Sequence, residues 1–397
     1  MAKTVLYPGN TLGIIGLDHN GRAMIAAAHE LGLKVHAYVN QPHPELTAQA
    51  DYTIVGNYRD KDKLTEFGEA CDAVVYVTAA IDAIVFKYLS QYTQVIQGVE
   101  PLEILQDRLM QRAFLDQVNV NIAPYVTVIS LDDVYQAIDS IGYPAVLKPI
   151  QRGGGDESMI IRRQSDIARA ANFMQAGTYL LESWIDHAAE YALTVAVADG
   201  KLQAYPLAKL DYTADRALLG VTAPVTVASD LQEEMMRITE ATVKQLGYQG
   251  ILTVEFYVTE SGNLYVKGIE PGLLDAGNIF ETAASLGLAA QMVRIAAGMP
   301  AQPAVVARPT ILMLTRTEQL KAVMRQQVLK DNWRFAYFLP EKPQPNQVVG
   351  FTWLAAFGDQ SLKDLADQLD ATSVWELPET AAAAEGEVEG TGAPAEE

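Results

Sequence analysis

Short apolar segments alternate with helical segments along the first hundred residues, and this alternation limits the possible folds more than any other feature of the sequence. An alanine-rich segment, 21–32, predicts a helix that ends at Gly32, because glycine commonly follows the last helical turn. Strands that alternate with helices form a parallel sheet covered on both faces. We therefore predict an α/β chain whose first domain, residues 1–103, is Rossmann-like. The strands predicted in this domain are 11–16, 34–39, 72–78 and 93–98.

A second α/β unit and a long hairpin are predicted beyond the first domain. The apolar segments 251–258 and 264–269 predict two paired strands, joined by a turn at Gly262 and Asn263. We expect a central domain over 104–300. The helices predicted there are 101–118, 131–142, 230–246 and 280–298.

The C-terminal part of the chain changes in character. Residues 301–378 contain short predicted strands and a proline-rich segment, which indicate a small β-rich domain. Residues 379–397 contain six Glu, no Lys or Arg, and no aromatic side chain to bury. We therefore predict that this acidic tail is disordered.

Composition excludes several classes of protein. The net charge of −20 argues against general binding to nucleic acid or to anionic membranes. No apolar run approaches the ~20 residues that span a bilayer, so we expect a cytoplasmic protein without a membrane partner. The single cysteine, Cys71, excludes an internal disulfide and a cysteine-based metal cluster.

The first glycine-rich turn contains Gly13, Gly16 and Gly21, in the segment GIIGLDHNGR. A strand, a glycine-rich turn and a helix can present backbone N–H groups to a phosphate. Here Asp18 stands where the phosphate would approach, and its negative charge opposes one. The pattern therefore favours a tight turn between strand and helix over a phosphate site.

A more specific pattern surrounds Lys148, which ends a predicted strand and is followed by RGGGD. A glycine-rich flap beside a lysine can cover nucleotide phosphates while the ammonium group neutralises them. The segment LLESWI could then contact an adenine edge, and Glu190 could accept hydrogen bonds from ribose hydroxyls. The order and spacing of these pieces predict a nucleotide site.

The predicted hairpin carries a carboxylate inside an apolar strand. Glu255 lies within LTVEFYV, and a buried carboxylate is costly unless it is paired or bound to a metal. A second acid would hold Mg²⁺ better than one alone. Glu270 could be that acid only if its strand continues far enough, and Pro271 predicts that the strand ends earlier.

Taken in order, QDR at 106–108, YPAVLKP, the flap, LLESWI, Glu190 and VEFYV resemble the ATP-grasp superfamily. Within it the chain is most similar to the carboxyaminoimidazole ribonucleotide synthetases, over roughly residues 4 to 375. The resemblance implies a pre-ATP-grasp domain, an ATP-grasp domain and a homodimer. It also implies a ligase of purine synthesis, in which ATP and bicarbonate form carboxyphosphate and the amine of aminoimidazole ribonucleotide is carboxylated.

The resemblance also implies roles for individual residues. The positions that match the ATP-binding residues of the family are Arg108, Lys148, Gly153, Gly154, Gly155, Glu182, Ile185 and Glu190. Glu255 matches one Mg²⁺ ligand, and Glu270 is the candidate for the second. Gly16, Gly21 and Arg22 match positions that contact the acceptor ribonucleotide.

Other positions depart from the family. The second metal carboxylate is Gly268, the flap lacks its lysine and two glycines, and a Glu-Asn-x-His segment has become residues 209–212. Three hypotheses follow: an active ligase that makes carboxyaminoimidazole ribonucleotide, an ATP-grasp ligase with a different acceptor, and a non-catalytic paralogue that binds nucleotide or a partner in a regulatory role.

Overall fold

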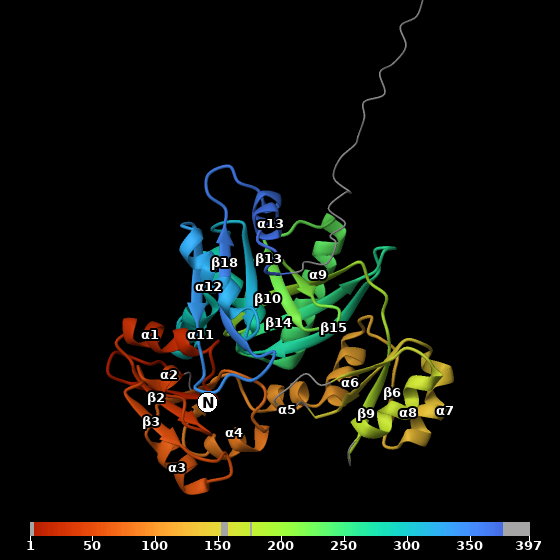
Figure 1. Ribbon diagram of the computed structural model, residues 1–397. Coiled ribbons are helices and arrows are strands. Elements are labelled where there is room, and N and C mark those ends of the chain that lie inside the picture. The colour runs from red at the N-terminus through yellow and green to blue at the C-terminus, as the bar shows by residue number, and fades with distance from the viewer. Residues whose placement is uncertain (1–3, 152–157, 175–176, 376–397) are drawn as a thin grey trace, which may run out of the picture.

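Three sheets, built from consecutive parts of the chain, organise the fold. The structure is a computed structural model that describes residues 4–151, 158–174 and 177–375. In Figure 1 the N-terminal domain, red to orange, and a small lobe, yellow, lie apart from each other below a large sheet, green to blue. Among the described residues, no helix combines the length and apolar character needed to span a membrane.

The N-terminal sheet is the parallel sheet predicted from the alternating pattern, with the order β3-β2-β1-β4-β5. Apolar residues of α1 pack on one face, and those of α3 and α4 pack on the other. The predicted α/β class is confirmed. The elements are β1 Thr11–Ile15, α1 Arg22–Glu30, β2 Lys34–Val39, α2 Pro44–Thr47, β3 Tyr52–Val55, α3 Lys61–Glu69, β4 Ala73–Tyr76, α4 Ala83–Leu89 and β5 Gln94–Val95.

The helix predicted over 101–118 is two helices, α5 Glu100–Gln106 and α6 Arg108–Val118, so that prediction was wrong. Asp107 separates them in an extended conformation, and its side chain accepts hydrogen bonds from the first free N–H groups of α6. An aspartate in this position stabilises a new helix start. The break redirects the chain from the N-terminal domain toward the small lobe.

The small lobe is an antiparallel sheet with the order β6-β9-β7-β8. Its two helices pack on the sheet through one apolar cluster, which is separate from the other cores. The elements are β6 Tyr125–Val128, α7 Leu131–Ile141, β7 Ala145–Pro149, β8 Met159–Ile161, α8 Gln164–Phe173 and β9 Tyr179–Ser183.

The large sheet has nine strands, in the order β15-β14-β10-β12-β13-β16-β18-β17, with β11 paired to β10. Apolar residues of α9 cover one face and those of α11 cover the other. Its strands are β10 Ala189–Ala198, β11 Lys201–Ala204, β12 Ala208–Tyr212, β13 Leu218–Ala223, β14 Gly250–Val258, β15 Leu264–Pro271, β16 Thr310–Arg316, β17 Trp333–Tyr337 and β18 Val348–Ala355. Its helices are α9 Ser229–Leu246, the 3₁₀ helix η1 Asp275–Ile279, α10 Phe280–Ala283, α11 Leu288–Ala296, α12 Leu320–Leu329 and α13 Leu362–Asp370.

One expectation about this part of the chain needs correction. The helix predicted over 280–298 is interrupted after Ala283, because Ala284 is extended and pairs with Val306. The C-terminal strands β16, β17 and β18 are present, but β16 pairs with β13 and thereby extends the large sheet. The predicted β-rich C-terminal part is therefore confirmed, and its described strands belong to the large sheet.

A close backbone contact joins the N-terminal domain to the large sheet. Leu273 N–H donates to the carbonyl oxygen of Val77 at 3.0 Å, directly after the end of β15. The preceding residue, Gly272, has φ +91°, and a Cβ atom there would lie 2.3 Å from the same carbonyl oxygen. Only glycine fits at this junction.

Replacing Gly272 by Ala should lower the free energy of unfolding by about 3 kcal/mol, since the left-handed backbone and the overlap with Val77 each cost ~1–2 kcal/mol or more. The matched control is Gly262→Ala, at φ +79° with no atom within 4 Å, which should cost only about 1 kcal/mol. Urea unfolding of the two variants measures the difference. Equal losses would contradict the proposed backbone overlap.

Candidate functional site

A small cavity lies between the small lobe and the large sheet and contains several of the predicted site residues. Its volume of about 20 Å³ is room for roughly one water molecule, so a nucleotide can enter only after the lobes move apart or side chains shift. The lining residues are Arg112, Ala123, Val146, Lys148, Glu182, Ser183, Trp184, Ile185, His187, Tyr257, Val266 and Lys267.

On the small-lobe side, Glu182 is buried between two cations. Lys148 Nζ lies 2.8 Å from Glu182 Oε2, and Arg112 Nε lies 2.6 Å from Oε1. Adjacent strands produce the first contact, because β7 and β9 place Lys148 and Glu182 diagonally on one face. Although burial alone would raise it, Lys148 and Arg112 lower the pKa of Glu182 to about 2. The carboxylate is therefore held ionised.

Arg112 joins this cluster to the large sheet. Its guanidinium group also donates from Nη2 to the carbonyl oxygen of Lys267 at 3.0 Å. The predicted phosphate contact Arg108 lies one turn earlier on α6 and donates from Nη1 to the carbonyl oxygen of Pro149 at 2.8 Å. Arg112 was not among the site residues predicted from the sequence, although its spacing of four residues from Arg108 places both on one face of a helix.

On the large-sheet side, Lys267 is the centre of a second charge cluster. Lys267 Nζ lies 2.7 Å from Glu255 Oε2 and 3.1 Å from Glu190 Oε2, and it donates to the Tyr212 hydroxyl at 2.7 Å. These side chains come from β15, β14, β10 and β12, which are neighbouring strands in this order, with β15 at the edge of the sheet. Although burial would lower it, the two carboxylates and Tyr212 raise the pKa of Lys267 well above its usual value.

A β-bulge explains why Lys267 reaches these acids. Glu255 pairs with Gly268 and Phe256 pairs with Val266, so Lys267 is an extra residue in its strand. In regular alternation Lys267 would share the face of Phe256, which is buried in the apolar core. The bulge turns the lysine to the face of Glu255.

Glu190 has further partners besides Lys267. His187 Nε2 lies 2.9 Å from its Oε1, and Arg216 forms an ion pair with the same oxygen. Although burial would raise it, the His187 hydrogen bond together with Lys267 and Arg216 lowers the pKa of Glu190 to about 2. The Arg216 guanidinium lies over the Tyr212 ring, at 4.6 Å from its centre. Because the Glu190 side chain is only 3% exposed, a ribose could reach it only after the surrounding side chains rearrange.

The predicted Mg²⁺ ligands, Glu255 and Glu270, lie on neighbouring strands of the hairpin. β15 runs to Pro271, so the expectation that the strand ends before Glu270 was wrong, and Glu270 shares the face of Glu255. Glu255 Oε2, however, already contacts the Lys267 ammonium. Among the described residues no group of three or more His, Cys, Asp or Glu side chains could hold a metal ion. The residues present do not fit a protein-bound Mg²⁺ at Glu255.

The opening turn lies against η1 and forms a third polar cluster. His19 Nε2 lies 2.7 Å from Asp275 Oδ1, and Asn20 Nδ2 donates to the same oxygen at 2.9 Å. Asp18 accepts hydrogen bonds from the backbone N–H groups of Asn20 and Gly21, which makes the tight turn expected there. The turn residues are separated from Asp275 by more than 250 positions, so no local pattern predicted this contact.

The remaining predicted residues lie in the N-terminal domain or outside the described residues. Gly16 has φ +71°, and its N–H donates to the carbonyl oxygen of Tyr38, while Arg22 begins α1 with an exposed side chain. The flap glycines at 153–155 and the acidic tail at 379–397 lie outside the described residues.

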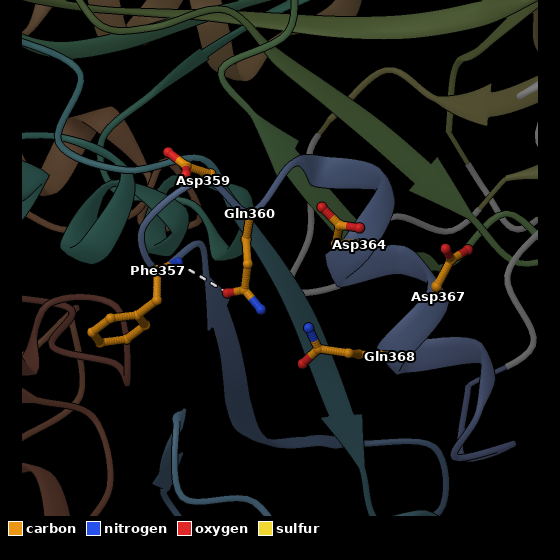
Figure 2. Close-up of a pocket in the computed structure, with 6 residues that line it drawn as sticks. All are labelled: Phe357, Asp359, Gln360, Asp364, Asp367 and Gln368. Carbon is orange, nitrogen blue, oxygen red and sulfur yellow. Dashed lines mark hydrogen bonds between the residues drawn. The ribbon is translucent and has the colours of Figure 1, made fainter.

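A second hollow, of about 520 Å³, lies on the C-terminal segment away from this cavity (Figure 2). Asp364 accepts hydrogen bonds from Ser361, the N-cap residue of α13, and Asp367 pairs with Lys363 at 3.0 Å. The Gln360 side chain accepts from the Phe357 N–H at 3.0 Å. These polar side chains are used in helix capping and loop structure, and the hollow supports no separate site.

Two family models match consecutive parts of the chain. A ribonucleotide synthetase preATP-grasp domain matches residues 9–106, and an ATP-grasp domain matches residues 113–286. The chain contains an ATP-grasp domain preceded by a preATP-grasp domain. It is 25% identical over 373 residues to N5-carboxyaminoimidazole ribonucleotide synthase of Bacillus subtilis, covering 93% of this chain and 97% of that protein. The protein of the same name from Staphylococcus saprophyticus is 28% identical over 275 residues, 68% of this chain and 72% of its own.

Solved structures share the fold of this ATP-grasp protein. An ADP complex of N5-carboxyaminoimidazole ribonucleotide synthetase superposes with a TM-score of 0.89 at 22% identity, covering 94% of this chain and 99% of that one. The Aspergillus clavatus enzyme, solved with ADP and 5-aminoimidazole ribonucleotide, gives 0.83 at 16% identity, with 92% and 99% covered. The resemblance inferred from the motifs, and the three-part architecture inferred with it, are confirmed.

Replacing Glu182 by Gln should remove a pH-dependent contribution to stability. The folded-state pKa of about 2 lies below the ordinary value of 4.5, so the contribution is present above pH 4.5 and is lost as the pH falls toward 2. This shift corresponds to about 3 kcal/mol. Urea unfolding near pH 7 and near pH 3 should show a smaller pH dependence for Glu182→Gln than for the wild type.

The control for this prediction is Glu234→Gln, which removes an exposed ion pair with Arg237 on α9. Exposed pairs contribute little, so this change should alter stability by less than about 1 kcal/mol at either pH. If Glu182→Gln behaved like Glu234→Gln, the buried cluster would not have the proposed role in stability.

Proposed function

We propose that this protein is an ATP-dependent carbon–nitrogen ligase of the carboxyaminoimidazole ribonucleotide synthetase type. The observation that carries the proposal is the cavity between the lobes, where Lys148, Glu182 and Ile185 line one space. Similarity to proteins named as this synthase, over 93% of the chain in one case, supports it. The proposal includes a place in purine synthesis, a cytoplasmic location and a homodimer.

In this proposal the two lobes hold ATP between them. Arg108 and Lys148 contact the phosphates, the flap glycines Gly153, Gly154 and Gly155 cover them, and a main-chain edge from Glu182 to Ile185 binds the adenine. Glu190 accepts from the ribose after the side chains around it rearrange. Magnesium enters as part of the substrate MgATP, because Lys267 covers Glu255, which together with Glu270 was the predicted metal site.

The reaction has two steps. A bicarbonate oxygen attacks the γ-phosphorus of ATP, the bond from that phosphorus to the bridging oxygen breaks, and ADP leaves with the electron pair. The acceptor amine then attacks the carbon of the resulting carboxyphosphate, and phosphate and a proton are released. Lys148 would stabilise the charge that develops on the phosphates, and closure of the lobes would exclude water.

A second candidate function, a ligase with a different acceptor, is supported by the cluster at the opening turn. The family positions Gly16, Gly21 and Arg22 adjoin Asp18 and Asp275, whose carboxylates would oppose the phosphate of a ribonucleotide. Burial raises the pKa of Asp18, whereas the His19 hydrogen bond, against the effect of burial, lowers the pKa of Asp275. An acceptor that carries an amine and no phosphate suits this surface better.

The decisive experiment is ADP release by the purified chain with MgATP and bicarbonate, with and without aminoimidazole ribonucleotide. Release that depends on the ribonucleotide is the expected result. Lys148→Met should reduce it by about a hundredfold or more, because one charged phosphate contact is worth several kcal/mol. Glu234→Gln, on the exposed face of α9, is the matched control and should leave the rate unchanged.

Release with other amines but not with the ribonucleotide would support the second candidate. A panel of small primary amines, tested with and without a terminal phosphate, separates the two functions. Binding of ATP without ADP release for any acceptor would overturn both ligase proposals and would favour the non-catalytic nucleotide-binding role.

A further inference from the structure

The Lys267 ammonium makes contacts that resemble those of a bound cation. Three oxygens surround this ammonium group, from Glu255, Glu190 and Tyr212 at 2.7, 3.1 and 2.7 Å. Its side chain is only 20% exposed, and those of the two acids are 14% and 3% exposed. The lysine is thus held at a fixed point inside the cleft.

The position of this ammonium is one where the family resemblance implies a metal. Glu255 matches a Mg²⁺ ligand, and the second ligand is replaced by Gly268, the residue next to Lys267. Gly268 pairs with Glu255 across the hairpin, so no side-chain oxygen remains opposite that carboxylate. The bulge instead presents the ammonium to Glu255. Gly268 removes a negatively charged ligand, and its neighbour Lys267 supplies a positive charge.

We infer that Lys267 takes the place of one divalent cation in the nucleotide site, so that the chain binds the phosphates of a nucleoside triphosphate through a built-in ammonium group. The inference rests on the nucleotide site of the proposed function. The charges agree with it, since Lys267 and Arg216 balance Glu190 and Glu255 as one divalent ion would balance two carboxylates. Lys267 and Lys148 line the same cavity from opposite lobes.

A divalent ion cannot join this arrangement without displacing the lysine. Mg²⁺ needs carboxylate oxygens at about 2.1 Å in near-octahedral geometry, and Glu255 Oε2 already contacts the ammonium. Two cations on one buried carboxylate would repel each other strongly in a site of low dielectric constant. Nucleotide binding in this protein should therefore depend little on added metal.

The first test measures ATP affinity by calorimetry in excess Mg²⁺ and in EDTA. For the wild type we expect dissociation constants within about threefold of each other. Lys267→Met should weaken binding in EDTA by about tenfold or more, the usual cost of a lost charged hydrogen bond, with recovery in Mg²⁺. The control Lys363→Met removes an exposed ion pair on α13 and should change neither value. A wild-type affinity that falls more than about tenfold in EDTA would overturn the inference.

The second test needs no nucleotide and uses Mn²⁺ as the probe. In Lys267→Met the carboxylates of Glu190 and Glu255 lose their shared cation, so millimolar Mn²⁺ should raise the melting temperature by about 2–4 °C. The wild type and Lys363→Met should show no such rise. Equal responses of the wild type and Lys267→Met would overturn the inference.

The two tests separate the inference from the proposed function. If ATP bound neither in Mg²⁺ nor in EDTA, the nucleotide site would be wrong, and the Mn²⁺ comparison would still decide whether Lys267 occupies a cation position. If Lys267→Met failed to fold, the wild-type comparison of Mg²⁺ with EDTA would decide the question without a variant.

Discussion

Arg112 makes the contact on which the rest of the cleft depends. Its guanidinium group pairs with Glu182 in the small lobe and donates to the carbonyl oxygen of Lys267 in the large sheet. Its side chain is 8% exposed, and breaking a buried pair of this kind usually costs several kcal/mol. The contact therefore links two lobes that have separate cores. It also places the two charge clusters, one around Glu182 and one around Lys267, on either side of one cavity.

Both clusters follow the same rule, that a buried acid needs a cation. Glu182 has Lys148 and Arg112, while Glu190 has Arg216 and shares Lys267 with Glu255. Isolated charges at these depths would be too costly to keep. The pairing has a functional consequence, because the groups that would bind a nucleotide also bind each other. Entry of a nucleotide then exchanges internal ion pairs for contacts to phosphate and ribose.

Much of the fold could be predicted from the sequence because its signals are local. Alternating strands and helices indicated the parallel sheet, and the turn at Gly262 indicated the hairpin. The helix break at Asp107 was not predicted, because the apolar pattern continues through the aspartate that caps α6. The bulge at Lys267 was not predicted either, since one extra residue reverses the face of a side chain and leaves no mark in the periodicity. Contacts such as His19 with Asp275 depend on the whole fold, and no short-range pattern indicates them.

The two departures at positions 267 and 268 are physically coupled. A glutamate at 268 beside Glu255 and Glu190 would need a divalent ion, whereas a lysine at 267 already neutralises those acids. With both present, the lysine and the metal would compete for one carboxylate. With neither, Glu255 would lose its cationic partner, while Glu190 would keep Arg216. Lys267 and Gly268 together therefore keep the buried carboxylates of this cleft neutralised without a metal ion. If the site had only lost a metal ligand, Glu255 would be a buried carboxylate without a cation. Instead, the Lys267 Nζ lies 2.7 Å from Glu255 Oε2.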